Sequence, residues 1–361
     1  SPLISLMKDQ AENLSKRGIP AAYLDSSMTG NAYGKILHDA LNKKCKFLYV
    51  APERLANQQF ISFAQKANIT MIAVDEAHCV SQWGRSFRKD YYNIPEFVKL
   101  LPSKPLIAAF TASATPEVRE DILERLNIRN AKQVITGFDR QNLYFAVQRT
   151  FDKQRSLLEY LSKHKQECGI IYCATRTKVE TVTRLLLENG YTAIRYHAGL
   201  TPTERRDNQN AFISGKVDIV VATNAFGMGI DKPNVRFVVH YNMPKDPESY
   251  YQEAGRAGRD GLPSDCYLFY NPQDVYTCRW FIENSENDQL TEEQKQIVKE
   301  QDHRRLKAMI HYAKTETCLR ETLLAYFGEK APKNCGNCSS CLKNYRQVDA
   351  TEDARKALSC I

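Results

Sequence analysis

The chain has 361 residues, 43% of them hydrophobic, which is enough to form the cores of two or three domains. Fifty Lys and Arg against 42 Asp and Glu give a net charge of +8, a modest excess that favours a polyanionic partner. No apolar stretch approaches the roughly 18 residues that a membrane span needs, and no charged-then-apolar leader is visible, so we expect a cytoplasmic protein without a membrane partner.

Strand-like apolar runs alternate with helical patterns twice along the chain. This alternation predicts an α/β fold with two parallel-sheet lobes, whose boundary we place near residues 137–142. Glycines in C-cap positions, Gly190 and Gly215, are expected to end two helices of the second half. The strands are expected at residues 47–50, 71–74, 106–110, 169–173, 218–222 and 237–240, and the two helices at 178–189 and 202–214.

The apolar run at residues 71–74 ends in the acidic cluster Asp75-Glu76-Ala77-His78. A buried parallel strand that stops at paired carboxylates delivers them to the edge of the sheet where α/β folds bind their ligands. Asp75 can hold a Mg²⁺ ion, and Glu76 can polarise the water that attacks a γ-phosphate. The alternative is a strand end with a solvated acidic turn.

A second candidate group lies in residues 249–261, which contain Gln252, Arg256 and Arg259. The two arginines are three residues apart, so we expect one helical face to carry both guanidinium groups. Guanidinium forks bind phosphate oxygens and neutralise charge that develops during phosphoryl transfer. The alternative is a basic turn, loosened by its glycines, on a solvated face.

From about residue 272 the pattern becomes helical and charged, and it ends in cysteines. Cys335, Cys338 and Cys341 form a C-x-x-C-x-x-C knuckle, and Cys318 lies seventeen residues earlier at a predicted helix start. Four thiolates with this spacing can complete a tetrahedral Zn²⁺ site. A disulfide framework and an iron-sulfur cluster are the alternatives at this point. The remaining seven cysteines are interpreted as core or surface thiols.

With these residues in view, the chain resembles the RecQ family of superfamily 2 DNA helicases over nearly its whole length. Each family motif alone is weak evidence, but seven motifs in family order are very specific. The residues that resemble them are 1–10 (Ia), 51–55 (Ib), 75–78 (II) with the aromatic-rich loop 81–88, 110–116 (III), 196–200 (IV), 222–231 (V) and 249–261 (VI).

The resemblance implies two RecA-like lobes and a helical zinc subdomain, with ATP, Mg²⁺ and Zn²⁺ as cofactors. It implies that the protein unwinds DNA in the 3′-to-5′ direction during DNA repair and recombination. The implied partners are single-stranded and branched DNA and a single-strand-binding protein, and the implied location is the cytoplasm, in association with the nucleoid. The implied domains are the first lobe at 1–137, the second lobe at 138–271, the zinc subdomain at 272–345 and, at 346–361, the start of a winged-helix domain.

The resemblance also assigns roles to individual residues. The catalytic residues would be Asp75, Glu76, Gln252, Arg256 and Arg259. The residues that bind the nucleotide would be Asp75, His78, Asp231, Arg256 and Arg259. Contacts to DNA would come from Trp83, Arg85, Phe87, Arg88, Tyr196, His197 and Thr223.

Simpler interpretations of these residues remain open. The aromatic residues of the loop 81–88 could pin it to its lobe, and His197 could be a satisfied core or turn histidine. Thr223 could be an ordinary strand-end hydroxyl, and Asp231 a cap on the turn before Pro233.

Two departures from the family pattern stand out. Arg85, Ser86 and Lys89 replace the usual His, Asp and Pro, which puts the coupling of DNA binding to ATP hydrolysis in doubt. Ser113 replaces a commoner threonine and keeps the hydroxyl group.

No P-loop, G-x-x-x-x-G-K-[S/T], is present. The nearest candidate begins at Gly30 and is one residue too short between its glycines, with Ile36 where a hydroxyl belongs. We therefore expect a chain cut at both ends and unable to hydrolyse ATP alone, with a groove or an exposed edge in the first lobe. The alternatives are a non-catalytic, zinc-stabilised DNA-binding module and an RNA helicase of the same superfamily.

Overall fold

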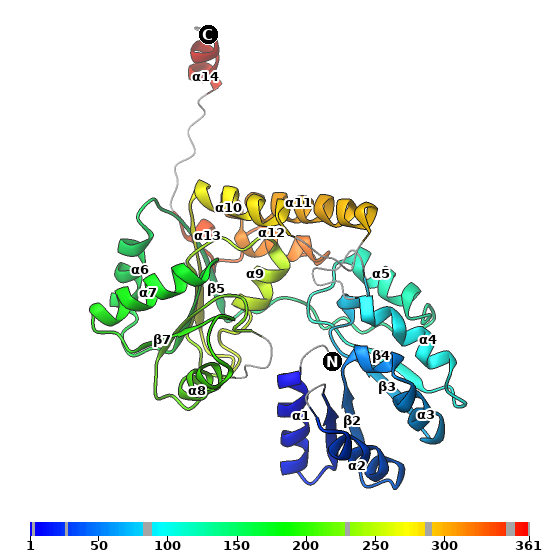
Figure 1. The fold of residues 1–361 in the computed structure, drawn as a ribbon. Helices are drawn as coiled ribbons and strands as arrows, with labels where there is room; N and C mark the ends of the chain where they lie inside the picture. The colour runs from blue at the N-terminus through cyan, green and yellow to red at the C-terminus, as the bar shows by residue number, and fades with distance from the viewer. Residues whose placement is uncertain are drawn as a thin grey trace.

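The computed structural model of the chain describes residues 1, 4–25, 28–81, 89–227, 232–285, 291–343 and 351–359. These residues form two α/β lobes, a helical region that contains the cysteine knuckle, and a terminal helix that stands apart from the rest (Figure 1). Every strand pair in both lobes is parallel, so the predicted fold class is confirmed.

The first lobe contains two short parallel strand pairs, β1 with β2 and β3 with β4. Strand β1 has no counterpart among the expected strands, because its sequence Ala-Ala-Tyr-Leu carries little β-propensity. In chain order the elements are α1 (Ile4–Lys16), β1 (Ala21–Leu24), α2 (Gly30–Leu41), β2 (Phe47–Val50), η1 (Pro52–Ala56), α3 (Gln58–Lys66), β3 (Met71–Val74), η2 (Ala77–Val80), η3 (Lys89–Tyr92), α4 (Asn93–Lys99), β4 (Leu106–Ala109) and α5 (Pro116–Arg125).

The strands of the first lobe leave large apolar side chains in contact with solvent. Leu106 on β4 is 66% exposed, Phe47 on β2 is 50% exposed and Met71 on β3 is 48% exposed. Among the described residues, β2 does not pair with β3, so the two strand pairs do not form one continuous sheet. The exposed edge expected from the sequence is therefore present.

The second lobe is a six-stranded parallel sheet in the order β5-β10-β9-β6-β8-β7. One face packs on α6 and α7 through residues such as Leu157 and Val182, and the other packs on α8 and α9 through Phe212 and Tyr250. The elements are β5 (Leu143–Arg149), α6 (Lys153–Lys163), β6 (Gly169–Tyr172), α7 (Arg176–Glu188), β7 (Ala193–Tyr196), α8 (Pro202–Ile213), β8 (Ile219–Ala222), β9 (Phe237–His240), α9 (Pro247–Ala254) and β10 (Ser264–Tyr270).

The helical region packs against the α9 face of the second lobe. Leu306, Met309 and Leu319 share one hydrophobic cluster with Tyr250 of α9 and Cys266 of β10. This region therefore has no core separate from the lobe. Its elements are α10 (Pro272–Glu283), α11 (Glu292–Lys314), α12 (Leu319–Tyr326) and α13 (Ser339–Leu342), and beyond them lies α14 (Thr351–Leu358).

Capping boxes begin the two long helices of this region. The side chain of Asn271 caps α10 with Asp274 as its partner, and Thr291 caps α11 with Gln294. In Figure 1, helix α11 lies below α14, along the upper side of the two lobes, and reaches toward the first lobe. No helix of the described residues is long and apolar enough to cross a membrane.

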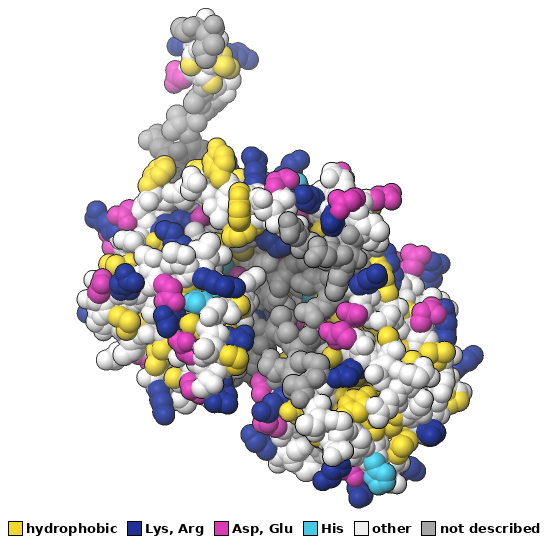
Figure 2. All heavy atoms as spheres, viewed as in Figure 1, with side chains coloured by type: hydrophobic (Ala, Val, Ile, Leu, Met, Phe, Trp, Pro, Cys, Tyr) yellow, Lys and Arg dark blue, Asp and Glu magenta, His cyan; other side chains and the backbone are white. Residues whose placement is uncertain are grey.

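Charged side chains are spread over the face shown in Figure 2, with Lys and Arg on both lobes. Hydrophobic side chains stand out at the upper edge of that view, near α10. On α10, Tyr276 and Trp280 are 64% and 61% exposed. They are four residues apart and therefore lie on one face of the helix.

Candidate active site and metal centre

Asp75 and Glu76 follow directly after β3, at its carboxyl end, as the sequence predicts. Glu76 has a φ of 48°, in the left-handed region that a residue with a Cβ adopts only when its surroundings hold it there. The Glu76 N–H donates to Asp75 Oδ1 at 3.0 Å. Asp75 Oδ2 is buried and accepts no hydrogen bond from the described residues. A buried carboxylate oxygen with no donor is suited to a cation.

His78 is buried at 5% exposure and joins two segments of the site. Its Nδ1 lies 3.2 Å from Glu76 Oε2 and 3.1 Å from Thr111 Oγ1. Burial by itself lowers the pKa of the imidazole, but the side chains of Cys79 and Glu76 outweigh burial and raise the pKa to about 9. The raised pKa favours the protonated ring beside the Glu76 carboxylate.

The segment after β4 lies beside the acidic cluster because backbone pairing continues past both strands. The Phe110 N–H donates to Val74 O at 2.9 Å, and the Ala77 N–H donates to Phe110 O at 2.8 Å. This pairing brings Thr111 within reach of His78. Thr111 was not singled out in the sequence, since its role depends on a contact across 33 residues. Ser113, two residues further on, is buried.

Gln252, Arg256 and Arg259 lie in the second lobe, but they do not share one helical face. Helix α9 ends at Ala254, and residues 255–260 form turns, so the predicted helical face with two guanidinium groups is wrong. The reason is local, because Gly255 ends the helix and Gly258 adopts a φ of 53°. Gln252, within α9, is half-buried.

The two arginines differ in their environments. Arg256 is 6% exposed, and its Nε has no hydrogen-bond partner among the described residues. A Cβ built on Gly227 would lie 3.1 Å from Arg256 Nη2, so the guanidinium packs closely against that glycine. Arg259 is exposed. The structure thus separates a buried arginine from an exposed one on the same turn.

Tyr196 and Thr223 lie at the carboxyl ends of the neighbouring strands β7 and β8, where the Thr223 N–H donates to Tyr196 O at 3.1 Å. His197 is 6% exposed, and both its ring nitrogens are engaged. Nε2 lies 2.9 Å from Glu180 Oε1, and Nδ1 accepts the Gly199 N–H at 3.2 Å. The interpretation of His197 as a satisfied turn histidine agrees with these contacts.

Several residues singled out in the sequence lie outside the described residues. They are Trp83, Arg85, Ser86, Phe87, Arg88 and Asp231.

The four predicted zinc ligands come together. The Sγ atoms of Cys318, Cys335, Cys338 and Cys341 all lie within 4.8 Å of one another, and those of Cys335 and Cys341 are 4.0 Å apart. Tetrahedral Zn²⁺ with Zn–S bonds of about 2.3 Å places sulfur atoms about 3.8 Å apart, so this cluster fits the ion. None of the ten described cysteines forms a disulfide.

Short local structure positions these thiols. Cys318 is the N-cap residue of α12 and Cys338 that of α13. The Cys341 N–H donates to Cys338 Sγ and the Asn337 N–H to Cys335 Sγ, each at 3.4 Å. Burial raises the pKa of Cys338, but the N–H groups of Cys341 and Leu319 and the neighbouring thiols outweigh it and lower the pKa. Burial raises the pKa of Cys335 and of Cys341, so Cys338 is the thiol among these three that ionises most readily.

The rejected P-loop candidate is a helix. Residues Gly30–Leu41 form α2, whose N-cap Thr29 accepts the Ala32 N–H. Within its first turn, the Ala32 N–H is bonded to Thr29 Oγ1 and the Tyr33 N–H to Thr29 O, so these two groups are not available to a phosphate as they would be in a P-loop.

Comparison with known families agrees with this arrangement. Residues 1–122 match the DEAD/DEAH box helicase family, residues 152–261 match the helicase conserved C-terminal domain, and residues 272–342 match the RecQ zinc-binding family.

Two bacterial proteins, each called ATP-dependent DNA helicase RecQ, are similar over all of this chain. The protein of Bacillus subtilis (strain 168) is 45% identical, and that of Pasteurella multocida (strain Pm70) is 41% identical. The chain spans 60% and 56% of their respective lengths.

Among solved structures, S. cerevisiae Dbp5 bound to RNA and ADP BeF3 is similar in fold, with a TM-score of 0.58 at 19% identity. The match covers 83% of this chain and 79% of that one. The fold, the four-cysteine zinc site and the similarity to bacterial relatives agree, and the chain belongs to the RecQ family of helicases.

Proposed function

We propose that this chain is the motor part of an ATP-dependent DNA helicase that moves 3′ to 5′ and acts in DNA repair and recombination. The observation that carries the proposal is the group at the end of β3, where Asp75 Oδ2 is buried with no donor among the described residues, beside Glu76 in its left-handed conformation. Two bacterial relatives that bear the name of such a helicase support the choice of DNA as the substrate.

The chain's own residues would divide the work as follows. Asp75 would hold Mg²⁺ through its free carboxylate oxygen, and Glu76 would orient and deprotonate water. The Glu76 carboxylate is held by His78, which in turn contacts Thr111. Bound Mg²⁺-ATP would supply the phosphoryl group and the energy for movement. Gln252, Arg256 and Arg259 of the second lobe would bind the phosphates and neutralise their charge.

Contacts to single-stranded DNA would come from both lobes. We assign Tyr196 and Thr223, which lie at adjacent strand ends, to one part of the strand path. His197 would support that path by holding the turn at Gly199, since its ring is already engaged. Trp83, Phe87, Arg85 and Arg88 would stack on bases and meet phosphates, and Asp231 would contact the nucleotide.

We further propose the domain limits 1–137, 138–271, 272–345 and 346–361, with a single-strand-binding protein as a partner. The limit near residue 138 is supported by β5, which begins at Leu143 and pairs with β10 of the second lobe.

The test is Mg²⁺-ATP hydrolysis by this chain with and without single-stranded DNA, beside Glu76→Gln and the matched surface control Glu96→Gln. We expect the 361 residues alone to hydrolyse ATP slowly or not at all, because they contain no P-loop. In a version that includes a P-loop, Glu76→Gln should lower kcat by about 10²- to 10⁴-fold, and Glu96→Gln should leave it unchanged. Equal rates for the wild type and Glu76→Gln in that version would refute the catalytic role.

A non-catalytic DNA-binding module is the second candidate, and the helix that begins at the nearest match to a P-loop, at Gly30, favours it. Fluorescence anisotropy with matched single-stranded DNA and RNA separates the possibilities. Tight DNA binding that ATP never changes, in any version of the protein, would support the module. Preference for RNA would overturn the choice of DNA, since the 2′-hydroxyl is what an RNA reader recognises.

A further inference from the structure

The short segment of residues 138–142 leads into β5 and lies between two parts of the molecule. On one side it contacts the turn at residues 255–262, which carries Arg256 and Arg259. On the other side it contacts α12 and the cysteine knuckle. None of its residues belongs to a motif singled out in the sequence, yet four of its five residues make side-chain contacts with these two parts.

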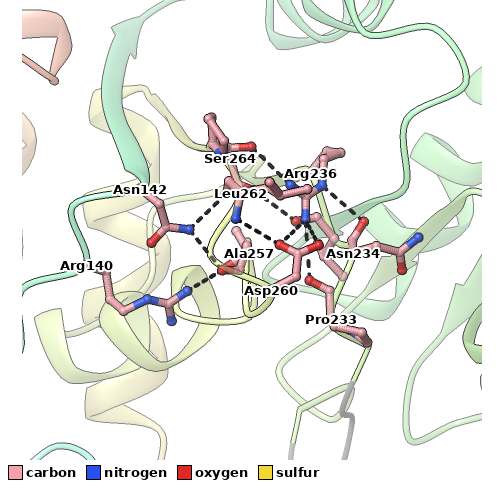
Figure 3. Close-up of polar contacts among 12 residues, drawn as sticks. Arg140, Asn142, Pro233, Asn234, Arg236, Ala257, Asp260, Leu262 and Ser264 are labelled. Carbon is pink, nitrogen blue, oxygen red and sulfur yellow. Dashed lines mark hydrogen bonds and ion pairs between the residues drawn. The ribbon is translucent and has the colours of Figure 1, made fainter.

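Arg140 binds the arginine-bearing turn through its backbone. Its guanidinium donates to the carbonyl oxygens of Gly258 at 2.7 Å, Ala257 at 3.1 Å and Gly255 at 3.3 Å (Figure 3). These carbonyls follow the end of α9, where the helix no longer supplies donors; Gly258 O also accepts the Gly261 N–H, and Arg140 supplies a side-chain donor to all three. The planar fork of arginine reaches three oxygens at once, which a lysine ammonium on a flexible stem cannot reproduce.

Asn142 holds the same turn from a second direction. Its Nδ2 donates to Gly258 O and to Leu262 O, each at 2.9 Å. The approach is so close that a Cβ built on Gly258 would lie 2.4 Å from Asn142 Nδ2. The far end of the turn is fixed by Arg236, whose Nη2 lies 2.7 Å from both carboxylate oxygens of Asp260 (Figure 3).

The opposite side of the segment is bound by the zinc region. Arg320 of α12 donates to Asp139 Oδ1 at 2.6 Å and to Arg140 O at 2.8 Å. Asn337, between the zinc ligands Cys335 and Cys338, donates to Gln141 O at 3.1 Å. The ring of Phe138 stacks on Phe327 with centroids 4.6 Å apart. The segment therefore contacts the metal site and the arginine-bearing turn through adjacent residues.

We propose that Arg140 and Asn142 are positioning residues that set where Arg256 and Arg259 stand, and that Arg320 and Asn337 of the zinc region hold them in place. The proposal rests on the proposed function for the meaning of the arginines, but the mechanical link stands on the contacts alone. On this proposal, the zinc region helps to position the arginines that bind phosphate.

The first test needs no ATP hydrolysis. Hydrogen exchange measured by mass spectrometry on this chain reports the turn through the N–H groups of Gly258, bonded to Val235 O, and Gly261, bonded to Gly258 O. We expect Arg140→Ala and Asn142→Ala to speed exchange in residues 255–262 by about tenfold, with peptides from β6 and β8 unchanged. Arg206→Ala, at an exposed arginine of α8, is the matched control and should change neither region.

The link to the zinc region has its own variant. Asn337→Ala leaves all four cysteines in place and touches no atom of the turn, yet it should also speed exchange in residues 255–262, by a smaller factor of about three. Arg140→Lys should remain close to Arg140→Ala if the fork matters, and close to the wild type if only charge matters. Unchanged exchange in 255–262 for Arg140→Ala, or an equal increase throughout the second lobe, would overturn the proposal.

ATP hydrolysis by a version that includes a P-loop supplies the second readout. Arg140→Ala should lower kcat by ten- to a hundredfold while KM for ATP changes less than threefold. Added to Arg256→Ala, it should cause little further loss, since both variants remove the same contribution. Multiplied losses would refute the positioning role. If the wild type hydrolyses no ATP in any version, the proposed function fails, and the exchange experiment still decides the mechanical link.

Discussion

His78 and Thr111 are 33 residues apart in the chain, and His78 Nδ1 lies 3.1 Å from Thr111 Oγ1 at the carboxyl ends of two paired strands. The same imidazole lies 3.2 Å from the Glu76 carboxylate. A single buried ring thus joins the acidic cluster after β3 to the segment after β4. Any movement of one segment changes the support of the carboxylate on the other.

Thr111→Val removes the hydroxyl while keeping the shape of the side chain. It should lower the free energy of unfolding by about 1 kcal/mol, the usual loss for one hydrogen bond to a buried group. Urea denaturation followed by circular dichroism measures this change. In a version that hydrolyses ATP, kcat should fall by more than the loss of folded protein explains, because His78 loses one of the two contacts that orient it. Thr111→Ser keeps the hydroxyl and serves as the control; a loss as large as that of Thr111→Val would contradict the explanation.

The raised pKa of His78 makes stability depend on pH. The folded-state pKa of about 9 lies above the ordinary value of 6.5, so the protonated ring stabilises the fold fully below pH 6.5. That contribution is lost as pH rises through 9. It amounts to at most about 3.5 kcal/mol, since one pKa unit corresponds to about 1.4 kcal/mol.

Urea midpoints measured from pH 6 to pH 10 for the wild type and His78→Gln test this dependence. The wild type should lose stability over that range by more than the variant does. Parallel curves for the two proteins would show that His78 does not titrate in this way.

Zinc should be essential for the helical region. Cys338→Ser removes a ligand that is fully buried, so zinc content should fall from one ion per chain to near zero. Because metal-binding energy is folding energy in such sites, unfolding of the region around α12 and α13 should shift to lower temperature. Atomic absorption and calorimetry measure the two effects. Cys45→Ser, outside the cluster, should keep both the zinc and the melting temperature, and retention of both by Cys338→Ser would exclude the site.

Two glycines should respond to alanine in opposite directions. A Cβ on Gly169 would lie 2.0 Å from the Phe237 ring. Gly169→Ala should therefore overpack the core of the second lobe and lower the free energy of unfolding by about 1–3 kcal/mol. Gly34 lies inside α2 with nothing within 4 Å of a Cβ, so Gly34→Ala should stabilise the helix by about 0.5–1 kcal/mol. Thermal denaturation distinguishes them, and destabilisation by both would show that α2 is not a helix in solution.

The parts of the molecule predicted from sequence are those that depend on local pattern. The apolar runs that became β3, β8 and β9 are continuous and β-branched, and the helices that end at Gly190 and Gly215 carry their own stop signals. The cysteine spacing similarly predicts the geometry of the knuckle, because the tight turns between the thiols allow few arrangements of the sulfur atoms. Strands β1, β5, β7 and β10 were missed. The sequences of β5 and β10 are in fact rich in Tyr, Phe and other strand-forming residues, whereas β1 and β7 offer only four residues each and a weaker pattern.

The sequence by itself determined the α/β class, the acidic cluster at a strand end and the four zinc ligands, since each follows from residue types at fixed spacing. Tertiary structure decided what those residues touch. It showed that α9 ends before Arg256, that His78 reaches Thr111, and that Arg140 binds the turn more than a hundred residues away. Such contacts join segments distant in the chain, so no local pattern records them, and only the packing of strands and helices brings their donors and acceptors together.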